Sequence, residues 1–395
     1  MNKAAGLILA PLSAIYSVAM RARRALYKRG VLRAQKINAP VISIGNITTG
    51  GTGKTPLVAW VARVIAQEGR RVCILTRGYG RADANRRVLV SDGERILANA
   101  REGGDEPFLL AEMLQGVAAV VSDADRVAAA RYALENLESQ VFILDDGFQH
   151  LRLARDLDLV TVDATNPWGG GNLLPRGHLR EPLNGLARAD CIIVTRSEQA
   201  QDIDALRKQA ARLSGGCPIL LSRTRTKALT LLSEAMLQSD AETRGGGDAG
   251  IKAASPRLAP HPSSLIPHPL PTQPIAAFCA IGNPSAFFAQ IRHDGNDLKF
   301  TRAFPDHHVY VQSDVDALVS EAMQAGALGL LTTAKDAVKL RSLRFELPCY
   351  VLEIELEFDD EEGLVRMIRQ AIRSDNLESR SLESRSLESK AKNSS

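Results

Sequence analysis

Cysteine is scarce and scattered in this sequence. Its five cysteines lie far apart along 395 residues, and none forms a C-x-x-C pair with another. Zinc sites and disulfide frameworks are built from closely spaced cysteines, so neither is predicted, and a reducing compartment is favoured. The excess of positive charge is also small, at +4. Bulk charge therefore does not indicate nucleic acid as a partner.

The sequence also lacks an apolar run of ordinary transmembrane length. The uncharged stretch Ala4–Met20 falls short of the roughly 20 apolar residues that a spanning helix needs, and it contains Pro11. Basic residues follow it directly, the reverse of the order in a cleaved signal peptide: Arg21, Arg23, Arg24, Lys28, Arg29, Arg33 and Lys36. Residues 1–36 are therefore predicted to form an interfacial helix on a membrane surface, with the basic cluster facing anionic lipid. The alternative is a helix packed on the protein's own core.

A glycine-rich turn joins the apolar run Val41–Ile44 to a helical pattern at Leu57–Ala66, the context of a phosphate-binding P-loop. Glycines let successive backbone N–H groups point at one anion, and the new helix adds its positive end. The pattern departs from G-x-x-x-x-G-K-[ST] at Thr48, where the first glycine would stand. A glycine-rich turn without a ligand is the alternative. The expected contacts of a nucleoside triphosphate are Thr48, Thr49, Gly50, Gly51, Thr52, Gly53, Lys54 and Thr55.

A second motif, V-F-I-L-D-D-G-F-Q-H, starts at Val141. Four apolar residues before Asp145 predict a buried parallel strand whose final carboxylate meets the Mg²⁺ of the P-loop. Because the adjacent carboxylates of Asp145 and Asp146 repel each other without a cation, the pair itself indicates a metal. Thr55, Asp145 and Asp146 are therefore the predicted metal ligands. Gln149 and His150 follow, where a group that orients the nucleophile could lie, although His150 is equally compatible with a structural role.

Three loops carry further candidates. The sequence R-G-Y-G-R (77–81) suits a loop that contacts an anionic ligand, or a plain surface turn. In G-G-D-E-P (103–107) the acidic residues either cap the next helix or supply a general base, and spacing alone leaves this open. The loop 167–182 is too rich in glycine and proline for regular structure, and such loops are usually functional. Its candidate contacts are Asn172, Arg176, Arg180 and Glu181.

Strands that alternate with helices behind a P-loop predict a doubly wound α/β core over residues 37–238. Residues 239–274 are rich in proline and glycine and predict a disordered insertion. Order resumes in a smaller α/β domain over 275–373, which contains a D-H-H triplet with one histidine predicted to face the active site. Residues 374–395 repeat a pentad and predict a disordered tail. Arg196 and Asp336 are candidate contacts for the nucleotide base.

These motifs, in this order, resemble the tetraacyldisaccharide 4′-kinase family of lipid A biosynthesis in Gram-negative bacteria. The segments that carry the resemblance extend to about residue 355, and they are specific only as a set: S-I-G-N-I-T-T-G-G-T-G-K-T-P (from Ser43), R-G-Y-G-R (from Arg77), G-D-E-P (from Gly104), D-D-G-F-Q-H (from Asp145), L-L-P-R-G-H-L-R-E-P (from Leu173), G-N-P (from Gly282), D-H-H (from Asp306) and T-A-K-D (from Thr333). The insertion and the tail have no counterpart expected in the family core.

The resemblance implies an ATP- and Mg²⁺-dependent kinase that phosphorylates the 4′-hydroxyl of a tetraacylated glucosamine disaccharide 1-phosphate. It implies a P-loop NTPase-like core and action at the cytoplasmic face of the inner membrane, with no obligate protein partner. Asp105 matches the family's base and His307 its partner, beside Lys54, Asp145 and Asp146. Expected substrate contacts are Arg77, Tyr79, Arg81, Arg126, Gln149, Asn172, Arg180 and Glu181.

A different class of function also fits the N-terminal helix and the P-loop, namely a membrane-tethered ATPase switch that controls a protein partner. Such switches often have a lysine where this chain has Thr49, which disfavours that reading. A soluble kinase of a small metabolite fits the catalytic motifs but leaves the apolar and basic N-terminus unexplained.

Overall fold

The computed structural model describes residues 3–232 and 273–373, with side chains from residue 9 onwards. These residues form two compact units. The core unit contains residues up to Thr224 and from Leu356 onwards, and the small unit contains Arg225–Glu355. The predicted insertion, as far as residue 272, and the predicted tail lie outside the described residues.

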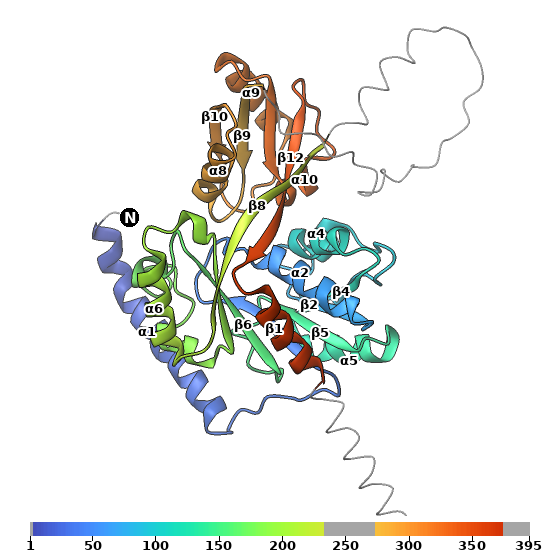
Figure 1. Ribbon diagram of the computed structural model, residues 1–395, viewed down its shortest axis with the longest axis vertical. Coiled ribbons are helices and arrows are strands. Elements are labelled where there is room, and N and C mark those ends of the chain that lie inside the picture. The colour runs from blue at the N-terminus through green and yellow to red at the C-terminus, as the bar shows by residue number, and fades with distance from the viewer. Residues whose placement is uncertain (1–2, 233–272, 374–395) are drawn as a thin grey trace, which may run out of the picture. The chain divides into compact units, whose positions relative to one another are not determined.

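A mostly parallel sheet forms the centre of the core unit (Figure 1). Its strands lie in the order β8-β7-β6-β1-β5-β2-β4-β3, with β3 antiparallel to β4 and the pairs from β8 to β4 parallel. Their bounds are β1 Val41–Asn46, β2 Val72–Thr76, β3 Val88–Ser91, β4 Ala118–Ser122, β5 Val141–Asp145, β6 Leu157–Asp163, β7 Cys191–Thr195 and β8 Ile219–Leu231. The confirmed doubly wound core includes β8, which the sequence analysis did not predict.

Helices cover both faces of this sheet, which is why its central strands read as continuous apolar runs. In β1, Ile42 and Ile44 pack towards α2 (Lys54–Gln67) and α4 (Asp105–Met113), while Val41 packs on the other face with α5 (Arg126–Asn136). Residues of β6 and β7 alternate in the same way, with α6 (Ile203–Ser214) on the α5 side. The sheet therefore leaves the carboxyl ends of β1 and β5 side by side at the edge where such folds bind ligands.

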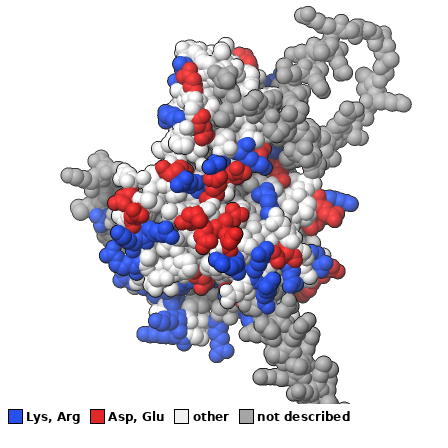
Figure 2. Space-filling view, in the orientation of Figure 1, with Lys and Arg blue, Asp and Glu red and all other residues white. Residues whose placement is uncertain are grey.

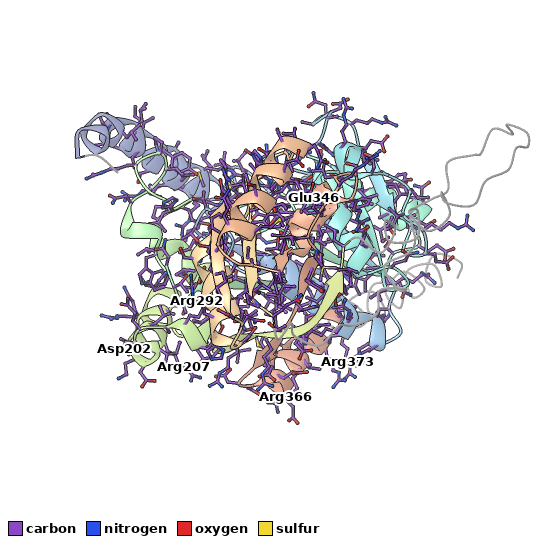
Figure 3. All side chains as sticks on the ribbon, turned by 90° about the horizontal axis from the view of Figure 1, so that it is seen from above. Asp202, Arg207, Arg292, Glu346, Arg366 and Arg373 are labelled. Atoms are coloured by element: carbon purple, nitrogen blue, oxygen red, sulfur yellow. The ribbon has the colours of Figure 1, made fainter. Side chains whose placement is uncertain are left out.

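The last described helix, at residues 361–373, belongs to the core unit. Leu364 and Ile368 pack into the same apolar cluster as α2 and α4, while Arg366 projects outwards (Figure 3). The sequence analysis had placed this helix in the domain over 275–373. That boundary is corrected, because the buried stripe of the helix packs into the apolar cluster of β1 and α2 in the core unit.

The small unit contains four parallel strands, in the order β10-β9-β11-β12. Its elements are β9 Ile275–Cys279, α8 Pro284–His293, β10 Leu298–Ala303, α9 Gln312–Gln324, β11 Gly329–Thr333, α10 Ala334–Leu340 and β12 Cys349–Phe358. The motifs G-N-P (from Gly282) and T-A-K-D (from Thr333) lie at the starts of helices, since Asn283 caps α8 and Thr333 caps α10. β12 and β8 carry the chain between the two units.

The N-terminal helix α1 (Lys3–Lys28) is docked on the core unit through one face. The Ser13 hydroxyl donates to the carbonyl of Leu173 at 2.9 Å, and the Tyr16 hydroxyl donates to the carbonyl of Arg180 at 2.7 Å. Leu12, Ile15 and Val18 are exposed, with Ile15 at 66%. Within the described residues we find no helix with the length and apolar content to cross a bilayer.

Candidate active site

The P-loop lies between β1 and α2, at the carboxyl edge of the sheet. Gly50 and Gly53 adopt φ angles of 107° and 76°, which glycine reaches without the steric penalty of other residues. Thr48, in place of the first glycine of the motif, has no such angle, so a side chain is tolerated there. Its backbone instead bridges to Leu179 in the loop 167–182. The departure from the motif is therefore accommodated by the backbone.

Two of the threonines predicted to touch nucleotide have buried side chains. The Asn46 amide donates to the Thr52 hydroxyl at 2.8 Å, and the Thr161 hydroxyl lies 2.9 Å from the same oxygen. Thr48 is buried as well. Contacts from Thr48 and Thr52 to a phosphate would come from their backbone, because their side chains are held by the fold.

Asp145 and Asp146, at the end of β5, are adjacent but differ in their surroundings. Burial, together with the charges of Glu106 and Asp146, raises the pKa of Asp145 to about 7, against the lowering effect of Lys54. The Thr76 hydroxyl donates to its carboxylate at 3.3 Å. Burial also opposes ionisation of Asp146, but the charges of Lys54 and Arg180 overcome it and lower its pKa to about 2. One carboxylate of the pair is therefore readily protonated and the other is held ionised.

Lys54 and Arg180 both bind Asp146. The ammonium of Lys54 lies 3.4 Å from one carboxylate oxygen, and the guanidinium of Arg180 donates to both oxygens at 2.7 and 2.6 Å. Asp146 has a positive φ of 53°, a backbone conformation that is uncommon for residues other than glycine. The P-loop lysine, the second motif and the loop 167–182 thus meet at one carboxylate.

The surroundings of Asp145 and Asp146 show how well each carboxylate fits the predicted metal site. Among the described residues, no group of three or more His, Cys, Asp and Glu side chains is arranged to hold a metal ion. Asp145 is buried beside two other carboxylates, an environment that a divalent cation would stabilise. Asp146 already has two cationic partners. Asp145 and the Thr55 hydroxyl, in the first turn of α2, therefore fit Mg²⁺ better than Asp146 does.

Asp105 is the first residue of α4 and lies beside the loop 77–81. Gly104 precedes it at a φ of 101°, and a Cβ added there would lie 3.1 Å from the Gly78 Cα and from the Tyr79 carbonyl oxygen. Glu106, the next residue, acts electrostatically on Asp145. Asp105 therefore stands at a helix start, where an ionised carboxylate is favoured, and its role as general base stays a prediction.

Four of the predicted substrate contacts are instead held within the protein. The guanidinium of Arg81 is buried and donates to the Ser122 carbonyl at 2.8 Å and to the Ala84 carbonyl. Glu181, only 1% exposed, accepts from Gln149 at 2.9 Å and from Arg188 at 3.0 and 3.1 Å. Arg126 is also buried, and burial lowers its pKa although Asp145 opposes this. The sequence alone could not show that these polar side chains have partners within the protein.

The other predicted contacts are more accessible. Arg77 and Tyr79 are exposed, with Tyr79 at 69%. Asn172 is exposed and its amide donates to the Gly170 carbonyl at 3.2 Å. Arg188, which pairs with Glu181 and lies over the Phe148 ring at 4.3 Å, was not predicted. Its sequence context, a short turn without a motif, offered no signal.

In the small unit the two adjacent histidines differ clearly. His308 lies 2.9 Å from Asp314 and stacks on Phe304 at 4.8 Å between ring centroids, so the fold accounts for it. His307 has a φ of 63°, and its N–H donates to the side chain of Asp306 at 3.0 Å. Asp336, a candidate for base contact, is fully buried and accepts from Tyr310 and Ala280, so that interpretation is corrected. The predicted pairing of His307 with Asp105 stays a prediction.

His150 is expected to make the free energy of unfolding depend on pH. Burial, together with the charges of Arg126 and Arg155, lowers its pKa to about 4. An unfolded chain takes up this proton near pH 6.5, so the free energy of unfolding should fall as pH drops from about 6.5 to 4, by at most about 1.4 kcal/mol per pH unit. Urea unfolding of wild type and His150→Gln at several pH values measures it. The variant should show the shallower dependence, and exposed His293→Gln is the control; equal slopes in all three proteins would contradict it.

Comparison with known proteins settles which family has this site. The family model "Tetraacyldisaccharide-1-P 4′-kinase" matches residues 5–373. The chain belongs to this family. A tetraacyldisaccharide 4′-kinase of Geobacter metallireducens is 38% identical over 366 residues, covering 92% of this chain and 98% of that protein. One from Anaeromyxobacter dehalogenans is 40% identical over 338 residues, covering 85% and 82%.

A solved structure agrees with the sequence relatives. The crystal structure of LpxK from Aquifex aeolicus in complex with ATP matches with a TM-score of 0.67 and 28% identity, over 93% of this chain and 99% of that one. The predicted family, fold class and ATP-dependent kinase activity are thereby confirmed, and the ATPase switch is not favoured.

Proposed function

We propose that this kinase transfers the γ-phosphate of ATP to the 4′-hydroxyl of a tetraacylated disaccharide 1-phosphate at the cytoplasmic surface of the inner membrane. The observation that carries the proposal is the meeting of Lys54, Asp146 and Arg180 at the carboxyl edge of β1 and β5. Phosphoryl transfer depends mainly on positioning and on neutralising charge. These residues concentrate charged side chains where a P-loop holds phosphates.

The side chains would divide the work as follows. The P-loop N–H groups and Lys54 bind the phosphates, so Lys54 moves from Asp146 to the nucleotide while Arg180 keeps Asp146 ionised. Mg²⁺ neutralises phosphate charge when bound, and Thr55 and Asp145 would hold it. Asp105 accepts the proton of the sugar hydroxyl as general base, and His307 is its proposed partner. Arg77 and Tyr79 are the exposed residues proposed to meet the anionic substrate.

Helix α1 supports a membrane surface as the place of action. Its apolar side chains Leu12, Ile15 and Val18 are exposed, whereas Ser13 and Tyr16 bind the core unit. Figure 2 shows Lys and Arg side chains gathered along the edge that the end of α1 and the following residues occupy in Figure 1. An apolar stripe beside a basic cluster favours the interface of anionic lipid. A membrane surface would bring this acylated substrate to the site.

The decisive experiment follows label from γ-³²P ATP to the lipid. The full chain in detergent is incubated with Mg²⁺ and tetraacyldisaccharide 1-phosphate, and an acceptor-free reaction is the control. We expect label on the lipid, and its loss in Lys54→Ala. Release of free phosphate without labelled lipid, stimulated by vesicles or a protein partner, would overturn the proposal. It would favour the hypothesis of a membrane-tethered ATPase switch instead.

A further inference from the structure

We infer that Thr195 and Arg196, at the end of β7, position the phosphate-binding N–H groups of the P-loop. The Thr195 hydroxyl donates to the carbonyl of Thr52 at 3.1 Å. The Arg196 guanidinium donates to the carbonyl of Gly51 at 2.9 Å. The inference rests on the proposed binding of ATP to this loop and assigns these two residues as positioning residues for it.

The direction of the two hydrogen bonds carries the argument. In a trans peptide the C=O and the following N–H point in opposite directions. Fixing the carbonyls of Gly51 and Thr52 against β7 therefore aims the N–H groups of Thr52 and Gly53 away from that strand. N–H groups held in one direction in advance form the anion site without an ordering cost when phosphate binds.

Arg196 is itself held rigidly. It has a φ of 55°, and the nitrogen that reaches Gly51 also lies 2.5 Å from the carboxylate of Asp163. Asp163, at the end of β6, accepts from the backbone and hydroxyl of Thr165 as well. Asp163 pairs in register with Thr195, so the ends of β6 and β7 lie side by side. Both strand ends therefore fix the Arg196 side chain, which in turn binds the P-loop. These hydrogen bonds from the rigid sheet therefore restrict the conformation of the glycine-rich P-loop.

Thr195 also shapes the loop by contact. Its methyl carbon would lie 3.3 Å from a Cβ added at Gly53, so it already limits the space beside the residue that precedes Lys54. Thr195→Val keeps this shape and removes the hydroxyl, whereas Thr195→Ser keeps the hydroxyl. The two variants separate the hydrogen bond from packing.

The test measures ATP affinity and steady-state kinetics of the full chain with Mg²⁺. The variants are Arg196→Met, Thr195→Val and Thr195→Ser, and the control is Arg207→Met, which removes an exposed charge from α6 (Figure 3). We expect Arg196→Met and Thr195→Val to raise the Kd and KM for ATP about tenfold. The KM for the lipid should stay within about twofold, and Thr195→Ser and Arg207→Met should resemble wild type.

The outcomes separate the inference from the proposed function. ATP affinity within twofold of wild type in both Arg196→Met and Thr195→Val would overturn the inference. So would equal increases in the KM values for ATP and lipid, which indicate a general effect on the fold. If Arg196→Met does not fold, the comparison of ATP affinity between Thr195→Val and Thr195→Ser is sufficient to test the inference. Wild-type protein that does not bind ATP would instead overturn the proposed function.

Discussion

Asp105→Asn is expected to keep ATP binding and to lose about 10²- to 10⁴-fold in kcat, because asparagine cannot accept the proton of the sugar hydroxyl. The exchange is nearly isosteric, and Asp105 lies at the start of α4 and not in the P-loop, so the nucleotide site should be unaffected. Direct ATP binding and the rate of lipid labelling measure the two properties separately.

The matched control for this variant is Asp204→Asn, which removes an exposed carboxylate from α6. It should retain wild-type activity. Turnover of Asp105→Asn within tenfold of wild type would argue against a proton acceptor at this position. Loss of ATP affinity together with turnover would indicate that Asp105 supports the nucleotide site instead.

Glu181→Ala is expected to lower the free energy of unfolding by about 3 kcal/mol, since removing one partner of a buried ion pair leaves the other charge without compensation. Glu181 is buried and binds Arg188 and Gln149 at once. Removing Arg188 as well should recover part of the loss, so the double variant should cost less than the sum of the single ones. Urea unfolding at pH 7.5 measures all three.

Glu94→Ala, an exposed glutamate of the core unit, is the control and should change stability little. The alternative is the role predicted from sequence, in which Glu181 contacts substrate. Wild-type stability with a raised KM for the lipid would restore that role. The proposed structural role predicts the reverse: a lower midpoint of unfolding, with the KM for the lipid changed little in the protein that remains folded.

Local sequence was sufficient for the features whose chemistry depends on neighbours in the chain. The turn from β1 into α2 needs glycine at Gly50 and Gly53 for its positive φ angles, and the lysine must follow directly. A run of apolar residues ending in Asp145 needs burial on both faces, which indicates a central parallel strand. These requirements are visible in a single sequence because each concerns consecutive residues.

The partners of polar side chains could not be predicted in the same way. Arg81, Thr52 and Glu181 lie in loops whose composition suggests ligand contact, yet each is buried and bound to a residue that is distant in sequence, namely Ser122, Thr161 and Gln149. The difference between Asp145 and Asp146 has the same origin. Arg180, which binds Asp146, comes from a loop 34 residues further along the chain.

The sequence by itself determined the P-loop, the doubly wound core and the family resemblance, since all of these depend on short patterns and their order. Only the tertiary structure decided that helix 361–373 returns to the core unit and that Thr195 and Arg196 support the P-loop. The physical reason is that burial and hydrogen bonding are satisfied by whichever groups the fold brings near. A side chain's partner is therefore chosen by distance in space and not by distance along the chain.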